Sequence, residues 1–173
     1  CNKEVCYQGF FRLERYRLRH TLFGGGWSGE LMRELLERGQ AAAILLYDAE
    51  RDSVVLIEQF RVGALTAPGG PWLLEIVAGI VDEHETGEDV ARREAMEEAG
   101  CAVLDLIPIC DYLVSPGGTS ERIKVYCGRV DASEARGIHG LAYEGEDICV
   151  HVVPLAEALD MLNAGRIDSA SPI

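Results

Sequence analysis

Residues 79–101 have the sequence GIVDEHETGEDVARREAMEEAGC, in which a loop-forming half precedes a helix-forming half. Thr86 is a good N-cap, and two acidic residues follow in the first turn, where the helix dipole favours negative charge. Gly100 is a residue type that commonly ends a helix. The segment therefore predicts a helix between Thr86 and Gly100.

Three glutamates share one face of this predicted helix. Glu94, Glu97 and Glu98 stand at positions i, i+3 and i+4, so their carboxylates crowd together. Like charges at this spacing repel, and a cation should compensate them. Carboxylate oxygens are ligands that Mg²⁺ prefers. A solvated acidic helix face is the alternative interpretation.

The same segment carries a longer pattern of fixed positions. It reads Gly, five residues, Glu, seven residues, Arg-Glu, an apolar residue, any residue, Glu-Glu, any residue, Gly and a final apolar residue. On this pattern the chain resembles the Nudix hydrolase family. Cys101 occupies the last position, where an aliphatic residue is usual, and a buried cysteine packs as a small hydrophobe.

The resemblance implies a divalent metal site on the helix, for Mg²⁺ with Mn²⁺ as the alternative. The implied metal ligands are the carboxylates of Glu94, Glu97 and Glu98 and the backbone carbonyl of Ala78. Arg93 and Glu85 would support these carboxylates, and Arg93 and Glu98 are therefore counted among the catalytic residues.

Length and composition describe a globular chain with strong negative charge. Its 173 residues suit one domain, or one domain with an appendage, and 48% are hydrophobic. The net charge of −13 argues against nucleic acid or an anionic membrane as a partner. It would also repel a phosphate-containing substrate unless a bound divalent ion offsets it.

Six scattered cysteines include no C-x-x-C pair. We interpret them as buried free thiols in a reducing compartment and expect a cytoplasmic protein. No apolar run approaches the roughly 20 residues of a membrane span, and no signal peptide is visible.

Apolar runs and turn signals predict mainly strands in the rest of the chain. The expected strands are residues 9–23, 27–38, 41–47, 53–60, 72–75, 76–78, 103–109, 112–114, 122–130 and 148–153. Residues 27–38 also have helical spacing, and the family resemblance decides for strand. A second helix should begin at Pro154 and run to about Asn163, before Gly165.

These elements predict an α+β fold in which helices cover a mostly antiparallel sheet. The Nudix fold is an α/β/α sandwich of mixed sheets, so the two expectations agree. We expect an N-terminal antiparallel β segment at residues 1–39 and a Nudix hydrolase domain at residues 40–173. In the family this β segment exchanges between the subunits of a homodimer and contributes to the partner's site, so the resemblance implies a homodimer.

Two loops narrow the resemblance to the bacterial ADP-ribose pyrophosphatases. Residues 115–121 read SPGGTSE, and Pro116 lies 16 residues after Gly100, a marker of that branch. Residues 137–148 resemble its catalytic loop, and Gly9-Phe10-Phe11 resemble its N-terminal segment. A plain turn between two strands is the alternative for residues 115–121.

Glu144 and Glu146 are alternate residues of the second loop. A metal-bound carboxylate is a poor base, so a separate carboxylate must take the proton from the attacking water. By resemblance Glu144 is the general base and Glu146 an additional metal contact. Two solvated glutamates in an acidic loop are the alternative.

The resemblance implies metal-dependent hydrolysis of the ADP-ribose pyrophosphate bond, giving AMP and ribose 5-phosphate. A Nudix hydrolase for a sugar nucleotide or dinucleoside polyphosphate is one alternative, and a non-catalytic nucleotide-sensing module is another.

Family correspondence also gives a set of residues that would contact the nucleotide substrate. They are Phe10, Arg33, Glu34, Arg38, Arg61, Ile80, Ser115 and Glu121. An exposed charged face is the alternative for Arg33, Glu34 and Arg38, and packing is the alternative for Phe10. Arg61 is the most persuasive, because guanidinium matches phosphate geometry.

Overall fold

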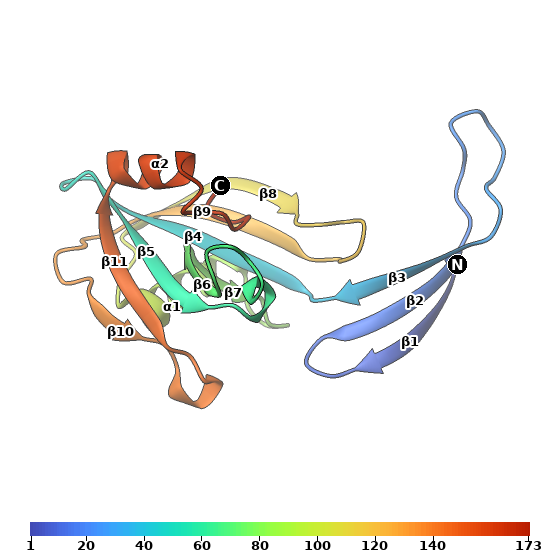
Figure 1. The fold of residues 1–173 in the computed structure, drawn as a ribbon, viewed down its shortest axis with the longest axis horizontal. Coiled ribbons are helices and arrows are strands. Elements are labelled where there is room, and N and C mark those ends of the chain that lie inside the picture. The colour runs from blue at the N-terminus through green and yellow to red at the C-terminus, as the bar shows by residue number, and fades with distance from the viewer. The chain divides into compact units, whose positions relative to one another are not determined.

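The computed structural model describes all of residues 1–173, which group into two units (Figure 1). The first unit comprises Cys1–Gln40 and Tyr112–Arg122. The second comprises Ala41–Asp111 and Ile123–Ile173. Neither α-helix has the length and apolar composition that crossing a membrane requires.

The first unit is built on a three-stranded antiparallel sheet in the order β1-β2-β3. These strands are β1 (Asn2–Gln8), β2 (Arg12–Leu18) and β3 (Leu31–Glu37). The prediction of a strand within residues 27–38 is therefore confirmed. The loop after β8 (Asp105–Leu113) pairs with the end of β3, since Leu36 N–H donates to Gly118 O and Ser120 N–H to Leu36 O, at 2.8 and 3.3 Å.

The strand predicted at residues 9–23 was placed wrongly at both ends. Gly9 N–H donates to Phe11 O at 2.9 Å, so residues 9–11 form the turn between β1 and β2. The predicted strand is thus limited to Arg12–Leu18, and β1 was missed. The prediction missed β1 because this strand buries none of its residues; antiparallel backbone pairing joins it to β2, and ionic contacts add to that pairing.

Those contacts converge on Glu14 of β2, whose side chain has no exposed surface. Lys3 Nζ lies 2.7 Å and Arg12 Nε 2.5 Å from Glu14 Oε1, while the Tyr16 hydroxyl donates to Oε2 at 2.6 Å. The hydrogen bond from Lys3, followed by that from Tyr16, lowers the pKa of Glu14 to about 2. A buried carboxylate is tolerable only when it is paired in this way.

The second unit holds most of a larger sheet in the order β10-β11-β5-β4-β9-β8, with β6 paired to β5 and β7 to β4. Its strands are β4 (Gln40–Asp48), β5 (Ser53–Phe60), β6 (Trp72–Glu75), β7 (Val77–Ile80), β8 (Asp105–Leu113), β9 (Arg122–Arg129), β10 (Gly137–His139) and β11 (Ile148–Pro154). The helices are α1 (Gly87–Ala99) and α2 (Leu155–Asn163), with 3-10 turns at Val62–Ala64 and Ala142–Glu144.

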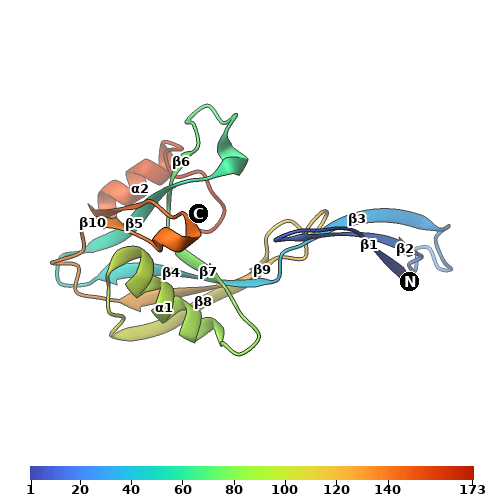
Figure 2. The ribbon, with the colours of Figure 1, turned by 90° about the horizontal axis from the view of Figure 1, so that it is seen from below.

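Both faces of β5 are buried, which is why a helix covers each side of the sheet. Val55 and Ile57 join the core beneath α1. Val54 and Leu56 point to the other face and are also buried. Figures 1 and 2 show α1 and α2 on these opposite faces. The predicted α/β/α layering of the Nudix fold is confirmed.

Three element predictions in this unit need correction. The two strands expected at residues 103–109 and 112–114 are one strand, β8, whose edge position tolerates Pro108. The short strand expected at residues 76–78 is displaced to Val77–Ile80 by its pairing with β4. Residues 137–139, where no strand was expected, form β10, which adds three residues to the sheet beside β11.

The cysteines are all unpaired, as predicted, but most are not buried. Only Cys101 is buried, under the core face of α1, while Cys1, Cys6 and Cys110 are exposed. The strand-like runs around the other cysteines misled the prediction because they include solvent-facing positions.

Candidate functional site

Helix α1 is fixed at both ends by its own sequence. Thr86 Oγ1 accepts the Asp89 N–H at 3.2 Å, and Asp89 Oδ2 accepts the Thr86 N–H at 3.0 Å, which forms a capping box. Gly100 ends the helix in the left-handed conformation, at φ 63°. Apolar residues such as Val90 and Ala95 bury the opposite face in the core. The acidic face is thereby held in one orientation.

Arg93 supplies the cation that the clustered glutamates require. Its Nε and Nη2 donate to the two oxygens of Glu85 at 2.9 and 3.1 Å. Its Nη1 donates to Glu94 Oε1 at 2.8 Å and to Glu97 Oε2 at 3.0 Å. The Glu85 hydrogen bonds raise the pKa of Arg93 and lower that of Glu85. One guanidinium therefore orients three carboxylates.

Glu98 has no such partner, although its residue is only 3% exposed. Its Oε2 accepts the backbone N–H of Ala78 at 3.2 Å. Burial, followed by the negative charges of Glu94 and Glu146, raises the pKa of Glu98 to about 8. Burial also raises the pKa of Glu94. Burial thus disfavours the charged forms of both carboxyl groups, and of the two only Glu94 has an ion-pair partner, Arg93.

Strand β7 brings the start of the signature segment against α1. A Cβ atom at Gly79 would overlap the Glu94 carboxyl group, so only glycine lets the two approach this closely. Ala78 and Ile80 flank Gly79 on the same strand, and the Ile80 residue is 39% exposed. The backbone of β7 and the carboxylates of α1 therefore form one surface.

The loop that carries Glu144 and Glu146 lies near the carboxylates of Glu94 and Glu98. The Glu146 carboxylate accepts the Leu141 N–H at 2.9 Å, and its charge acts on both Glu94 and Glu98. Glu144 ends a 3-10 turn and is exposed. Glu146 thus lies close enough for its charge to act on the acidic cluster, which is formed by Glu94, Glu97 and Glu98 of α1. The Glu144 side chain is open to solvent.

This donor set fits a hard divalent cation. It offers carboxylate oxygens of Glu94, Glu98 and Glu146, and Glu98 is a buried acid without a cationic side-chain partner. Residues 1–173 contain no group of three or more His, Cys, Asp or Glu side chains arranged as a preformed metal site. Mg²⁺ does not need one, because it usually takes one or two carboxylates and completes its shell with water and phosphate oxygens.

Arg61 follows β5 and adds a positive charge to this unit. Its Nε donates to Glu75 Oε2 at 2.6 Å, its side chain is 44% exposed, and its charge acts on Glu98. Gln59, two residues earlier, is buried, and its side-chain amide nitrogen lacks a hydrogen-bond partner. No pattern in the sequence indicates this buried amide, because a Gln in a strand is ordinarily solvated.

The remaining predicted substrate residues belong to the first unit. Arg38 Nε lies 3.2 Å from Glu121 Oε1, and the Arg38 guanidinium lies 4.6 Å from the Phe11 ring centre. Phe10 is 85% exposed, and Ser115 is exposed in its turn. Adjacent residues of a strand point to opposite faces, so Arg33 and Glu34 do not share one. Glu34 pairs weakly with Arg15, at 3.4 Å.

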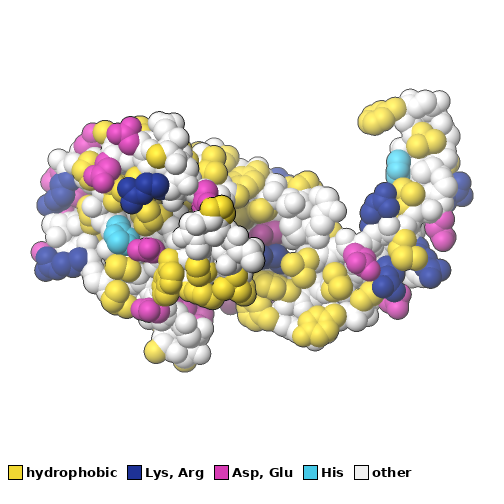
Figure 3. All heavy atoms as spheres, viewed as in Figure 1, with side chains coloured by type: hydrophobic (Ala, Val, Ile, Leu, Met, Phe, Trp, Pro, Cys, Tyr) yellow, Lys and Arg dark blue, Asp and Glu magenta, His cyan; other side chains and the backbone are white.

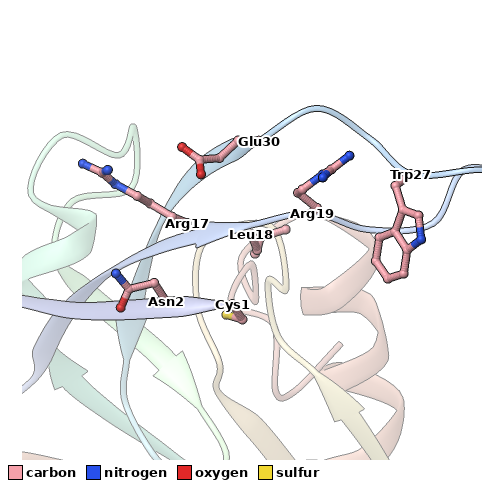
Figure 4. Close-up of a pocket in the computed structure, with 7 residues that line it drawn as sticks. All are labelled: Cys1, Asn2, Arg17, Leu18, Arg19, Trp27 and Glu30. Atoms are coloured by element: carbon pink, nitrogen blue, oxygen red, sulfur yellow. The ribbon is translucent and has the colours of Figure 1, made fainter.

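The first unit also has a pocket of 610 Å³ that no prediction anticipated (Figure 4). Its lining residues are Cys1, Asn2, Arg17, Leu18, Arg19, Trp27 and Glu30. None of these is a predicted site residue, and Arg19 is already engaged, with its Nε donating to Ser28 O at 2.8 Å.

Comparison with known proteins agrees with the signature. The family model described as the NUDIX domain matches residues 37–171. The chain belongs to the Nudix family. All residues of the Nudix signature fall inside the matched range, as do both loops that carry Glu121 and Glu144.

Two Nudix relatives and one solved structure indicate the subgroup and the fold. An ADP-ribose pyrophosphatase of Escherichia coli strain K12 is 53% identical over 171 residues, covering 99% of this chain and 82% of that protein. A GDP-mannose pyrophosphatase of Pectobacterium atrosepticum is 35% identical over 172 residues, covering 99% and 88%. A crystal structure of an ADP compounds hydrolase has a TM-score of 0.72 at 21% identity, covering 97% of this chain and 84% of that one.

One contact at the C-terminal end of α1 could not be predicted from the sequence. The ring of His139 lies against Gly100, where a Cβ atom would come within 2.7 Å of His139 Cε1. The only signal in the sequence is that glycines at 137 and 140 bracket this histidine. Such glycines are equally typical of an ordinary loop.

Proposed function

We propose that this chain is an ADP-ribose pyrophosphatase that hydrolyses the pyrophosphate bond to give AMP and ribose 5-phosphate. The observation that carries the proposal is the buried carboxyl group of Glu98, which accepts the Ala78 N–H and has no ion-pair partner, on a helix whose neighbouring glutamates are oriented by Arg93. The 53% identity to an enzyme of that name supports the substrate.

In this proposal Glu94, Glu97, Glu98 and Glu146, with the Ala78 carbonyl, hold Mg²⁺ or Mn²⁺. When bound, such an ion offsets phosphate charge and lowers the pKa of a coordinated water. Glu85 keeps Arg93 in place, and Arg93 keeps Glu94 and Glu97 from turning away. These residues contribute positioning and electrostatics, which dominate phosphoryl-transfer catalysis.

Glu144 is the proposed general base, because it is exposed and has no cationic partner in the loop. It takes the proton from the attacking water while the water oxygen bonds to phosphorus and the bridging oxygen leaves with its electron pair. Arg61 would bind the phosphates, and the backbone at Ile80 would lie near them.

The other proposed substrate contacts are Phe10 for adenine stacking, Arg33, Glu34 and Arg38 for the nucleotide, and Ser115 and Glu121 for the terminal ribose. The exposure of Phe10, at 85%, leaves its ring free to stack. The partial burial of Glu121 by Arg38 preorganises a carboxylate that can accept ribose hydroxyl donors.

We further propose that residues 1–39 form a dimerisation segment and residues 40–173 the Nudix hydrolase domain of a cytoplasmic homodimer. Val5, Tyr7 and Met32 are exposed apolar side chains of the N-terminal sheet and support a partner there. Figure 3 shows hydrophobic side chains, in yellow, at the surface of this unit. Six unpaired cysteines support a reducing compartment. Light scattering after gel filtration measures the oligomer directly, and a monomer at micromolar concentration would contradict this arrangement.

The test of the activity is hydrolysis of a nucleotide panel with and without EDTA. We expect EDTA-sensitive release of AMP from ADP-ribose by the wild type. Glu98→Gln and Glu144→Gln should each slow it about 10²-fold or more, as losing a base or an electrostatic group does. Wild-type turnover by Glu144→Gln would remove the base assignment.

A sugar-nucleotide pyrophosphatase is the second candidate, because the GDP-mannose pyrophosphatase of P. atrosepticum is 35% identical over almost the whole chain. Including GDP-mannose in the panel separates the two. A higher kcat/KM for GDP-mannose than for ADP-ribose would favour this second function.

A further inference from the structure

His139 lies at the junction between β10 and the loop that carries Glu144 and Glu146. Its ring packs over Gly100, with Cε1 placed 2.7 Å and Nδ1 3.5 Å from where a Cβ atom of residue 100 would stand. Its Nε2 lies 3.0 Å from the carbonyl oxygen of Arg136. A carbonyl can only accept, so Nε2 carries the hydrogen and the ring has one fixed orientation.

The next residue connects this ring to α1. The Gly140 N–H donates to the backbone carbonyl of Glu97 at 3.2 Å. That carbonyl is one of the last four of the helix, which have no partner inside it. The loop therefore satisfies the end of the same helix whose side chains form the acidic cluster.

Glu146 folds back over this anchor. A Cβ atom at Gly140 would come within 2.7 Å of Glu146 Cβ, and the Leu141 N–H donates to Glu146 Oε2 at 2.9 Å. The charge of Glu146 in turn acts on Glu94 and Glu98. Contacts thus run from Gly100 through His139 and Gly140 to Glu146, whose charge acts on Glu94 and Glu98.

We propose that His139 is a positioning residue, which fixes the Leu141–Glu146 turn on the C-terminal end of α1 and so sets Glu144 and Glu146 relative to the glutamates of the helix. It touches no reacting atom and acts through the loop. The inference rests on the proposed function for its kinetic consequence, but the anchoring itself is independent of the substrate.

Three substitutions separate the two contacts of the ring. His139→Ala removes the packing and the donor, His139→Phe keeps the ring volume over Gly100 without the donor, and His139→Gln keeps an N–H donor without the ring. Ile138→Ala is the matched control, because Ile138 precedes His139 in β10 and is 66% exposed.

We expect His139→Ala to lower kcat for ADP-ribose about 10-fold to 10²-fold, since small displacements of catalytic groups cost this much. KM should stay within about three-fold, because the proposed substrate contacts lie elsewhere. His139→Gln should recover most of kcat, His139→Phe only part, and Ile138→Ala should match the wild type.

Amide hydrogen exchange gives a readout that needs no turnover. Exchange at Gly140 and Leu141 should accelerate about 10-fold or more in His139→Ala, with the α1 amides and the melting temperature little changed. Where the alanine variant is too unstable to assay, His139→Phe carries the same comparison.

Wild-type kcat together with wild-type exchange at Gly140 and Leu141, in either variant, would overturn the proposal. Accelerated exchange with unchanged kcat would also overturn it, because the loop would then be anchored without consequence for the reaction. If the wild type leaves ADP-ribose intact, the proposed substrate is wrong. The same kcat comparison is then made with the panel nucleotide that is hydrolysed. Hydrogen exchange still tests whether His139 holds the Leu141–Glu146 turn on α1.

Discussion

The carboxyl group of Glu94 lies so close to Gly79 that a Cβ atom at residue 79 would overlap it. The Glu94 carboxyl group can therefore occupy its present position only while residue 79 is glycine. We expect Gly79→Ala to push Glu94 out of the acidic cluster and to lower kcat about 10²-fold, as losing an electrostatic group does.

Gly69→Ala is the control for that variant. A Cβ atom at Gly69 would meet no atom within 4 Å, and its backbone is not in the left-handed region. Steady-state kinetics of both variants, with melting curves, make the comparison. Equal activity of the two would show that the Glu94 position does not depend on Gly79.

Arg93→Lys tests whether the guanidinium fork, rather than positive charge alone, orients the cluster. A lysine ammonium cannot make the two parallel bonds to Glu85 while also reaching Glu94 and Glu97. We expect kcat to fall about 10²-fold, because the loss of orientation resembles the loss of an electrostatic group.

The neighbouring Arg92→Lys provides the matched control for Arg93→Lys. Arg92 makes one hydrogen bond, from Nη1 to Val103 O at 2.7 Å, and a lysine can replace that. A similar loss of activity in both variants would mean that the geometry of Arg93 is unimportant.

The sequence predicted those features that depend on local pattern. The capping residue Thr86, the stop at Gly100 and the carboxylate face of α1 are all set by neighbours within one or two helical turns. The hairpin of β4 and β5 was equally predictable, because apolar runs flank a polar turn.

Features that depend on contacts between distant residues were not predictable in the same way. Strand β1 has no buried face, and it is recognisable only from its pairing with β2. The contact of His139 with Gly100 joins residues on separate elements. Periodicity along the chain does not indicate contacts between residues that are distant in sequence. The family resemblance predicted only those site residues that belong to the family's motifs.

Asp48 should make stability depend on pH. It is 1% exposed, and its carboxylate accepts the backbone N–H groups of Glu50, Arg51 and Ala132 at 2.9, 3.1 and 2.9 Å. The Ala132 hydrogen bond is the largest cause that lowers the pKa of Asp48 to about 2. The carboxylate thus ties the β4–β5 turn to the segment after β9.

A depressed folded-state pKa contributes stability above the unfolded value of 3.8, and that stability is lost as the pH falls through about 2. We expect Asp48→Asn to melt several degrees below the wild type at about pH 6, with the gap narrowing between about pH 4 and pH 2. Melting curves across this range check it. A gap that stays constant to the lowest pH would exclude the carboxylate as its cause.

Glu121→Gln distinguishes a substrate contact from a purely structural ion pair. Glu121 lies 3.2 Å from Arg38 with its side chain 12% exposed, and the Arg38 guanidinium also stacks on Phe11. If Glu121 accepts ribose hydroxyl groups, as proposed, the amide should raise KM for ADP-ribose about 10-fold and lower kcat less, the pattern of a lost uniform binding contact. The melting temperature should shift by only about 2 °C, because a partly exposed ion pair contributes little to stability.

Glu4→Gln is the control, since Glu4 is 64% exposed and lies 3.8 Å from Arg15 in the same unit. A large drop in melting temperature without any change in KM would assign Glu121 to the fold of the first unit instead of to the substrate.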